Sequence, residues 1–219
     1  MNDIAILKSN SVYRIGDIFL CNGPRFKKDR EEILNNKKYQ NTILYDYLIH
    51  KSNEKDYTLL NDCIKTYINK NHLKIPHQNE LVVHVRLGDI VGNTLHRKSK
   101  FSYESVKRKY SDLISNDLFN EYNINNATIV TALHFGNDVA RNRYLYEDDA
   151  KIKSLDILND IETQIKQQNI SYSIISNENI DVDFCYMANA KYFKQSFGGF
   201  SQIISELVSI NGGISFDLL

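Results

Sequence analysis

The chain has 219 residues, of which 42% are hydrophobic and 25% are charged, and these proportions are those of an ordinary folded protein. They argue against intrinsic disorder, collagen-like repeats and coiled coil, and the length suffices to bury a core without a disulfide or a metal. Lys plus Arg equals Asp plus Glu at 27 each, so no positive excess favours a nucleic-acid partner. A local basic pocket is compatible with this balance.

No apolar stretch reaches the roughly 20 residues that span a bilayer, and the polar start Met1-Asn2-Asp3 differs from a signal peptide. We therefore expect a cytoplasmic protein with no membrane span. The three cysteines, Cys21, Cys63 and Cys185, lie far apart without a Cys-x-x-Cys pair, which predicts reduced, mostly buried thiols. The sequence leaves the oligomeric state open.

The first third of the chain predicts a short, mainly helical region, residues 1–76, which ends at Pro76 in a polar stretch. Residues 4–7 and 12–20 are predicted short strands, and 25–36 a charged helix. Further apolar residues recur at helical spacing, namely Leu44, Tyr47, Leu48, Tyr57, Leu60, Ile64, Tyr67 and Ile68.

Residues 77–219 alternate between apolar strands and amphipathic helices, which predicts an α/β fold with a doubly wound parallel sheet covered on both faces. In such a Rossmann-like domain, ligands bind outside the carboxyl ends of the strands. The predicted strands are 81–85, 127–133, 170–175 and 192–195, and the predicted helices begin near Ser102 or cover 152–165, 183–189 and 199–209.

The first of these strands ends in His84-Val85-Arg86-Leu87-Gly88-Asp89. Strand alternation sends His84 and Arg86 to one side, and Gly88 permits a sharp turn. The planar fork of Arg86 can bind phosphate oxygens in bidentate fashion. The alternative is that Arg86 pairs with Asp89 and that His84 is a core residue with its hydrogen bonds satisfied.

A second loop, Ser196-Phe197-Gly198-Gly199-Phe200-Ser201, joins a strand to an amphipathic helix. Its two glycines permit close backbone approach, and the first amides of the helix form an anion site that Ser201 can supplement. It is neither a Walker loop nor a Gly-x-Gly-x-x-Gly fingerprint. The alternative interpretation is a plain turn.

The two loops together resemble the nucleotide-sugar-binding half of the superfamily of α-1,2-, α-1,6- and protein O-fucosyltransferases. These enzymes carry a strand that ends in His-x-Arg-Arg-x-Asp or His-x-Arg-x-Gly-Asp, and residues 84–89 fit the second form. They also carry an Asp before an apolar helix with a Met, then a Lys-containing turn, a strand and a loop that ends in Phe-Ser. The matching residues within the similar region, 80–208, are Asp183, Phe184, Met187, Lys191, Phe200 and Ser201.

This resemblance implies the GT-B-type donor half and a metal-independent, inverting transfer of fucose or a related sugar from a GDP-sugar to a glycan. It implies that Arg86 holds the β-phosphate, that His84 contacts the donor nucleotide, that Asp183 reads guanine and that Ser201 contacts phosphate. Residues 1–76 would then be a reduced acceptor domain. That short region, and Leu87 in place of a second Arg, favour an alternative: a non-catalytic nucleotide- or glycan-binding module.

In such a transfer, Arg86 and the amides of Gly198 and Gly199 could stabilise the departing GDP without a metal. Asp89 is a candidate catalytic residue because it follows the motif, but no general base is singled out. His134 could line the pocket, or it could lie in a plain turn. Four further acidic residues are predicted to lie in a solvated loop, namely Asp138, Glu147, Asp148 and Asp149.

Asp181-Val182-Asp183 is formally the Asp-x-Asp of metal-dependent glycosyltransferases, which makes metal-dependent transfer a less favoured alternative. Asp183 could also be the N-cap of the helix that follows it. The six histidines are dispersed, so no zinc site is predicted.

Overall fold

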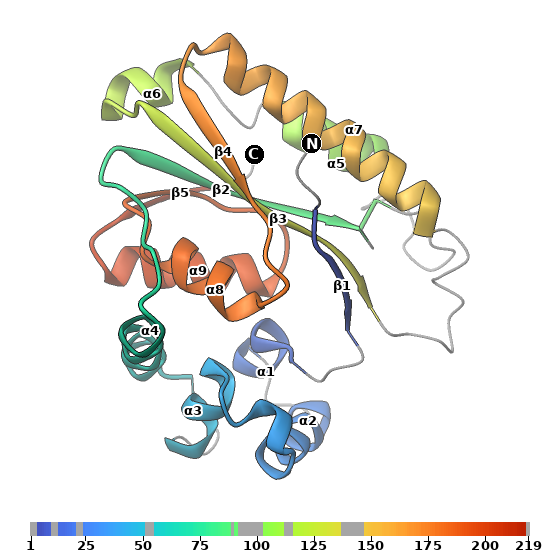
Figure 1. Ribbon diagram of the computed structural model, residues 1–219, viewed down its shortest axis with the longest axis vertical. Helices are drawn as coiled ribbons and strands as arrows, with labels where there is room; N and C mark the ends of the chain where they lie inside the picture. The colour runs from blue at the N-terminus through green and yellow to red at the C-terminus, as the bar shows by residue number, and fades with distance from the viewer. Residues whose placement is uncertain are drawn as a thin grey trace.

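A computed structural model describes residues 4–9, 13–20, 24–50, 55–88, 90–91, 103–111, 116–136 and 147–217. Within them, six strands form one sheet in the order β1-β3-β2-β5-β6, with β4 also paired to β3 (Figure 1). Every strand pair is parallel, which confirms the predicted doubly wound α/β fold. The strands are β1 (Ile6–Ser9), β2 (Glu80–Gly88), β3 (Asn126–Gly136), β4 (Ser171–Ile175), β5 (Tyr192–Lys194) and β6 (Ile214–Phe216).

Two strands share one side of β3, because β4 pairs with its amino-terminal half and β1 with its carboxyl-terminal half. The amide of Ala5, just before β1, donates to Oγ of Ser176, just after β4, at 2.8 Å. The two short strands therefore lie end to end along one edge of the sheet.

One face of the sheet packs against α5 (Tyr103–Ser111), α6 (Asn116–Tyr122) and α7 (Glu147–Gln167). The odd-numbered residues of β2 point into this core, since successive side chains of a strand alternate between the faces. They are Leu81, Val83, Val85 and Leu87, all fully buried.

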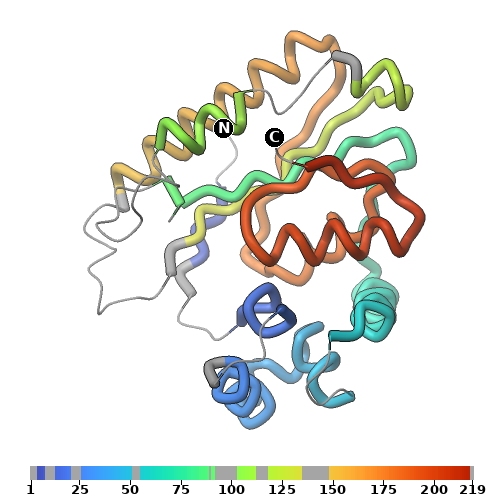
Figure 2. Tube along the Cα trace, turned by 180° about the vertical axis from the view of Figure 1, so that it is seen from behind, coloured from blue at the N-terminus to red at the C-terminus, as the bar shows by residue number. Residues whose placement is uncertain are grey.

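The opposite face packs against α8 (Ile180–Ala188) and α9 (Gly199–Ile210), and the amino-terminal helices join the same core (Figures 1 and 2). These helices are α1 (Ile15–Leu20), α2 (Pro24–Asn35), η1 (Lys37–Tyr39), α3 (Ile43–His50) and α4 (Tyr57–Asn71). The mainly helical character predicted for the first region is confirmed, while β1 lies in the sheet. The division of the chain at residue 76 stays a prediction.

The predicted strand at 12–20 is wrong, because Ile15–Leu20 form the helix α1. Ile15, Ile18 and Phe19 are buried at helical spacing, and a short apolar run does not distinguish a buried helix from a strand. The helix α6 and the strand β6 were not predicted either. No described helix is long and apolar enough to cross a membrane, and the described cysteines, Cys63 and Cys185, are free and buried as predicted.

Asp181 ties α8 to the amino-terminal helices. Its carboxylate is 1% exposed and accepts hydrogen bonds from the Tyr13 hydroxyl and, at 2.9 Å, from the amide of Ile43, the first residue of α3. Burial raises the pKa of Asp181 to about 7, and the bond from the Ile43 amide opposes that shift. A carboxylate at the start of a helix also interacts favourably with the helix dipole.

We expect Asp181→Ala to lower the free energy of unfolding by about 1–3 kcal/mol, because the partly buried Tyr13 hydroxyl and the buried Ile43 amide lose their partner. The matched control is Asp148→Ala, since the Asp148 side chain is 96% exposed and its pairing with Lys151 contributes little. Urea unfolding of the three proteins measures both effects. Equal losses in the two variants would contradict the role of Asp181.

Candidate functional site

The carboxyl ends of β2 and β5 form the topological switch point of the sheet. From β2 the chain moves to β3 and β4 on one side, and from β5 it moves to β6 on the other. The β2–β5 ladder covers only Leu81–Val83 and Tyr192–Lys194, whereas β2 continues beside β3 to Gly88. Ligands of open α/β sheets bind at such a point, so the residues beyond the ladder are the candidates.

Arg86 meets the start of α9 at this point. Gly198 is the N-cap of α9 with φ 88°, and a Cβ built there would lie 2.6 Å from Nη1 of Arg86. Both the positive φ and this approach require glycine. The first amides of a helix lack partners within the helix, and its dipole is positive there. The Arg86 guanidinium and the α9 amino terminus thus place positive charge side by side.

His84 lies on the same face of β2 as Arg86, as predicted. It is 9% exposed, and its ring centroid lies 5.7 Å from that of Phe200 in α9. Burial, aided by the nearby Arg86 charge, lowers the pKa of His84 to about 3, so the imidazole is neutral. Its Nδ1 is buried without a hydrogen-bond partner in the described part of the chain. His84 is therefore no satisfied core residue, and its free nitrogen suits a ligand.

Gly88 and His134 are register partners at the end of the β2–β3 ladder. Gly88 has φ 85°, and a Cβ there would lie 2.5 Å from the carbonyl oxygen of His134. The strand β3 continues to Gly136, so the interpretation of His134 as part of a turn is wrong. Strand alternation puts the half-buried His134 on the same face as Val130, which packs in the α8–α9 core.

Ser201 and Gly199 hold the loop rather than face outward. Ser201 is fully buried, and its Oγ accepts the amide of Ser196 at 2.7 Å. A Cβ on Gly199 would lie 2.8 Å from Cδ1 of Leu20, so α1 packs directly on the first turn of α9. A contact between Ser201 and phosphate stays a prediction, and it would use the hydroxyl hydrogen of Ser201, since Oγ accepts the Ser196 amide through a lone pair.

Asp183 is 6% exposed and accepts hydrogen bonds from the side chain and, at 3.4 Å, from the backbone of Asn177. Burial raises the pKa of Asp183 to about 6, and these bonds oppose the shift. The N-cap interpretation is wrong, because α8 begins at Ile180 and its N-cap is Asn179, whose side chain accepts the amide of Asp181.

The Asp-x-Asp pair does not converge in the structure. Asp181 binds Tyr13 and the start of α3, while Asp183 binds Asn177, because residues two apart on a helix do not face each other. Among the described residues, no group of three or more His, Cys, Asp or Glu side chains could hold a metal ion. That the protein needs no metal stays a prediction.

The candidate bases are placed only in part. Asp89 and Asp138 lie outside the described residues, as does the side chain of Glu147. Asp148 is exposed, and Asp149 pairs with Lys153 at 2.7 Å; both belong to the first turn of α7 rather than to a loop. These two carboxylates are solvated, as predicted.

Sequence reasoning missed the role of Tyr110. In the sequence it is one apolar position on a helical stripe, but its hydroxyl contacts Ser196 and the backbone of Arg86. The only available signal was a hydroxyl on an aromatic residue of a core-facing stripe. A guanidinium, the amides of a helix start and a neutral imidazole together suit an anion with several oxygens, such as a diphosphate.

We expect Gly198→Ala to weaken pyrophosphate binding by about tenfold, because the new Cβ displaces the Arg86 guanidinium. Gly212→Ala is the control, since Gly212 has φ 74° and open space around its Cα. Both variants should lose about 1–3 kcal/mol of stability from backbone strain. Calorimetric titration separates them, and equal pyrophosphate affinity in the two variants would contradict the site.

No protein-family model matches the sequence, and no curated protein does. Among solved structures, the chain is similar to a crystal structure of POFUT1 in complex with GDP, at 14% sequence identity and a TM-score of 0.38. The match covers 72% of this chain and 45% of that chain, so this chain spans less than half the length of its neighbour. Nothing about the activity of this chain follows from similarity at that level.

Proposed function

We propose that the chain binds a GDP-sugar at the β2–β5 switch point and transfers fucose or a related sugar to a glycan acceptor, without an obligatory metal. The observation that supports it is the Arg86 guanidinium lying against Gly198 at the start of α9. The choice of donor rests on the resemblance of residues 84–89 and 183–201 to the fucosyltransferase motifs.

The phosphate end of the site would do the chemical work. An inverting transfer forms a bond between C1 of the sugar and the acceptor oxygen, while the C1–O bond to the β-phosphate breaks and GDP leaves with the electron pair. In this proposal, Arg86 and the first amides of α9 stabilise the negative charge that grows there. The neutral His84 would form one hydrogen bond with the GDP-sugar through Nδ1. The acceptor proton needs a base, for which Asp89 stays the candidate.

The base end would lie toward α8. Phe184, next to Asp183, packs on Phe200 with centroids 5.3 Å apart, and Phe200 packs on His84 at 5.7 Å. These aromatic contacts connect α8, the helix that carries Asp183, to the phosphate end. A carboxylate can accept hydrogen bonds from both N1–H and the 2-amino group of guanine, so guanine would replace the donors that Asn177 now supplies.

We expect Arg86→Ala to weaken GDP by about tenfold or more, because a charge-assisted pair is lost, and Arg86→Lys to recover only part of the affinity. Calorimetric titration with GDP measures these affinities. Adding EDTA to the same titrations tests whether binding needs a metal. Arg108→Ala, which removes an exposed guanidinium on α5, is the control.

Unchanged GDP affinity in a folded Arg86→Ala protein would overturn the assignment. GDP binding without turnover of GDP-fucose on any glycan would favour the non-catalytic module. Binding restored only by Mn²⁺ would favour the metal-dependent alternative.

We also expect the unmodified chain to bind GDP better than ADP or UDP, because only guanine offers the paired N1–H and 2-amino donors that can replace Asn177 at the Asp183 carboxylate. Asp183→Asn should remove much of that preference, because an amide has one acceptor oxygen where the carboxylate has two. Asp181→Asn is the matched control on the same helix, since its carboxylate faces Tyr13 and Ile43 instead. Equal affinity of the unmodified chain for GDP and UDP would exclude the guanine role.

A further inference from the structure

The hydroxyl of Tyr110 reaches the candidate site from the opposite side of the sheet. Tyr110 belongs to α5 and is 1% exposed. Its hydroxyl accepts the amide of Arg86 at 3.1 Å, lies 3.3 Å from the carbonyl oxygen of Arg86, and is hydrogen-bonded to Oγ of Ser196. One side chain thus contacts both β2 and the loop before α9.

This contact takes the place of the hydrogen bonds that a longer β5 would make with β2. The N–H and C=O of Arg86 point to the side where β5 would continue, but the β2–β5 ladder has already ended at Val83 and Lys194. Backbone groups that are buried need hydrogen-bond partners. The Tyr110 hydroxyl is a hydrogen-bond partner of both the N–H and the C=O of Arg86. Oγ of Ser196 also accepts the Arg86 N–H, at 3.2 Å.

The loop side of the contact is equally close. Ser196 is 8% exposed, and its amide donates to Oγ of Ser201 inside α9. The Tyr110 ring also packs edge-on against Phe197, with centroids 5.6 Å apart. Tyr110 therefore fixes the first two residues of the loop that carries Gly198, and so fixes the spacing between this loop and Arg86.

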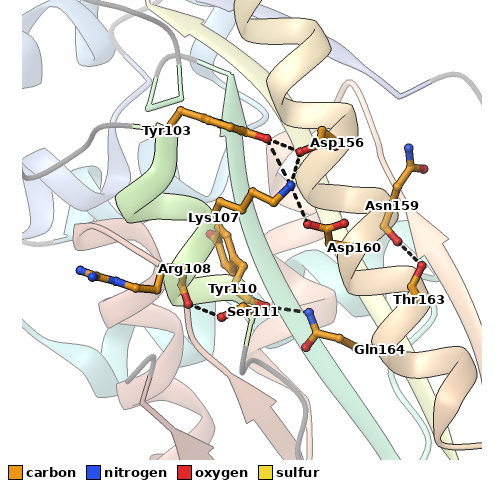
Figure 3. Close-up of polar contacts among 10 residues, drawn as sticks. All are labelled: Tyr103, Lys107, Arg108, Tyr110, Ser111, Asp156, Asn159, Asp160, Thr163 and Gln164. Carbon is orange, nitrogen blue, oxygen red and sulfur yellow. Dashed lines mark hydrogen bonds and ion pairs between the residues drawn. The ribbon is translucent and has the colours of Figure 1, made fainter.

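The helix α5 is itself anchored on α7 (Figure 3). Lys107 pairs with Asp156 at 2.6 Å and Asp160 at 3.0 Å, and Gln164 donates to the carbonyl oxygen of Tyr110 at 2.9 Å. The ion pairs of Lys107 and the hydrogen bond from Gln164 to Tyr110 itself keep the Tyr110 hydroxyl at a defined depth under β2.

We propose that Tyr110 is a positioning residue, which touches no ligand and holds the Arg86 strand and the Gly198 loop at the spacing that lets both contact one diphosphate. This inference rests on the proposed function, and it adds a determinant of affinity from the opposite face of the sheet.

The test compares Tyr110→Phe with Tyr103→Phe in the full chain. Both remove one phenol oxygen from α5, but that of Tyr103 binds Asp156 and not the loop. We expect Tyr110→Phe to speed hydrogen exchange of the amides of 196–200 and to weaken GDP by about fivefold, the effect of one neutral hydrogen bond. Tyr103→Phe should leave both values unchanged.

Ser196→Ala removes the hydroxyl that bonds to Tyr110 and leaves the packing of the Tyr110 ring. If Tyr110→Phe does not fold, we expect the same faster exchange and weaker GDP binding from Ser196→Ala. In the double variant, the loss of GDP affinity should fall short of the product of the single losses, because the two hydroxyls act through one contact. Exchange and GDP affinity that are the same in Tyr110→Phe and Tyr103→Phe would overturn the proposal. If the unmodified chain binds no GDP, the proposed function is wrong, and exchange at 196–200 alone decides whether Tyr110 orders the loop.

Discussion

The early end of the β2–β5 ladder is the constraint on which the candidate site depends. Pairing stops at Val83 and Lys194, while β2 runs on beside β3 to Gly88. The backbone of Arg86 must then find partners outside the sheet, and hydroxyl groups of α5 and of the loop after β5 supply them. Because β5 ends early, the loop after it brings the α9 amino terminus against the Arg86 guanidinium.

The positive character of the site is local, because the chain as a whole has no formal net charge. It comes from one arginine and the start of one helix, while the neighbouring His84 stays neutral in its buried position. The buried carboxylates of α8 accept hydrogen bonds from other parts of the chain: Asp181 from the amino-terminal region and Asp183 from Asn177. The two carboxylates therefore have separate structural tasks, whereas the Nδ1 of His84 has no hydrogen-bond partner in the described part of the chain.

The sequence predicted the fold class and the common face of His84 and Arg86, because strand alternation and the strand–helix pattern are local signals. It failed for residues 15–20, where a short apolar run fits a helix and a strand equally well. It also could not place the Ser201 hydroxyl or the Tyr110 contact. The latter joins residues 86 positions apart in the chain, and no local pattern encodes such a pairing.

The end-to-end arrangement of β4 and β1 has a consequence for the order of assembly. The carboxyl-terminal half of β3 is paired on that side by β1, whose partner lies more than half the chain away. Closing so large a loop costs more entropy than the nearby β3–β4 crossover, so β1 should dock late. During synthesis, β1 must wait for β3 to emerge. The helix that follows β1, α1, packs on the first turn of α9, so this contact forms only after α9 has also emerged.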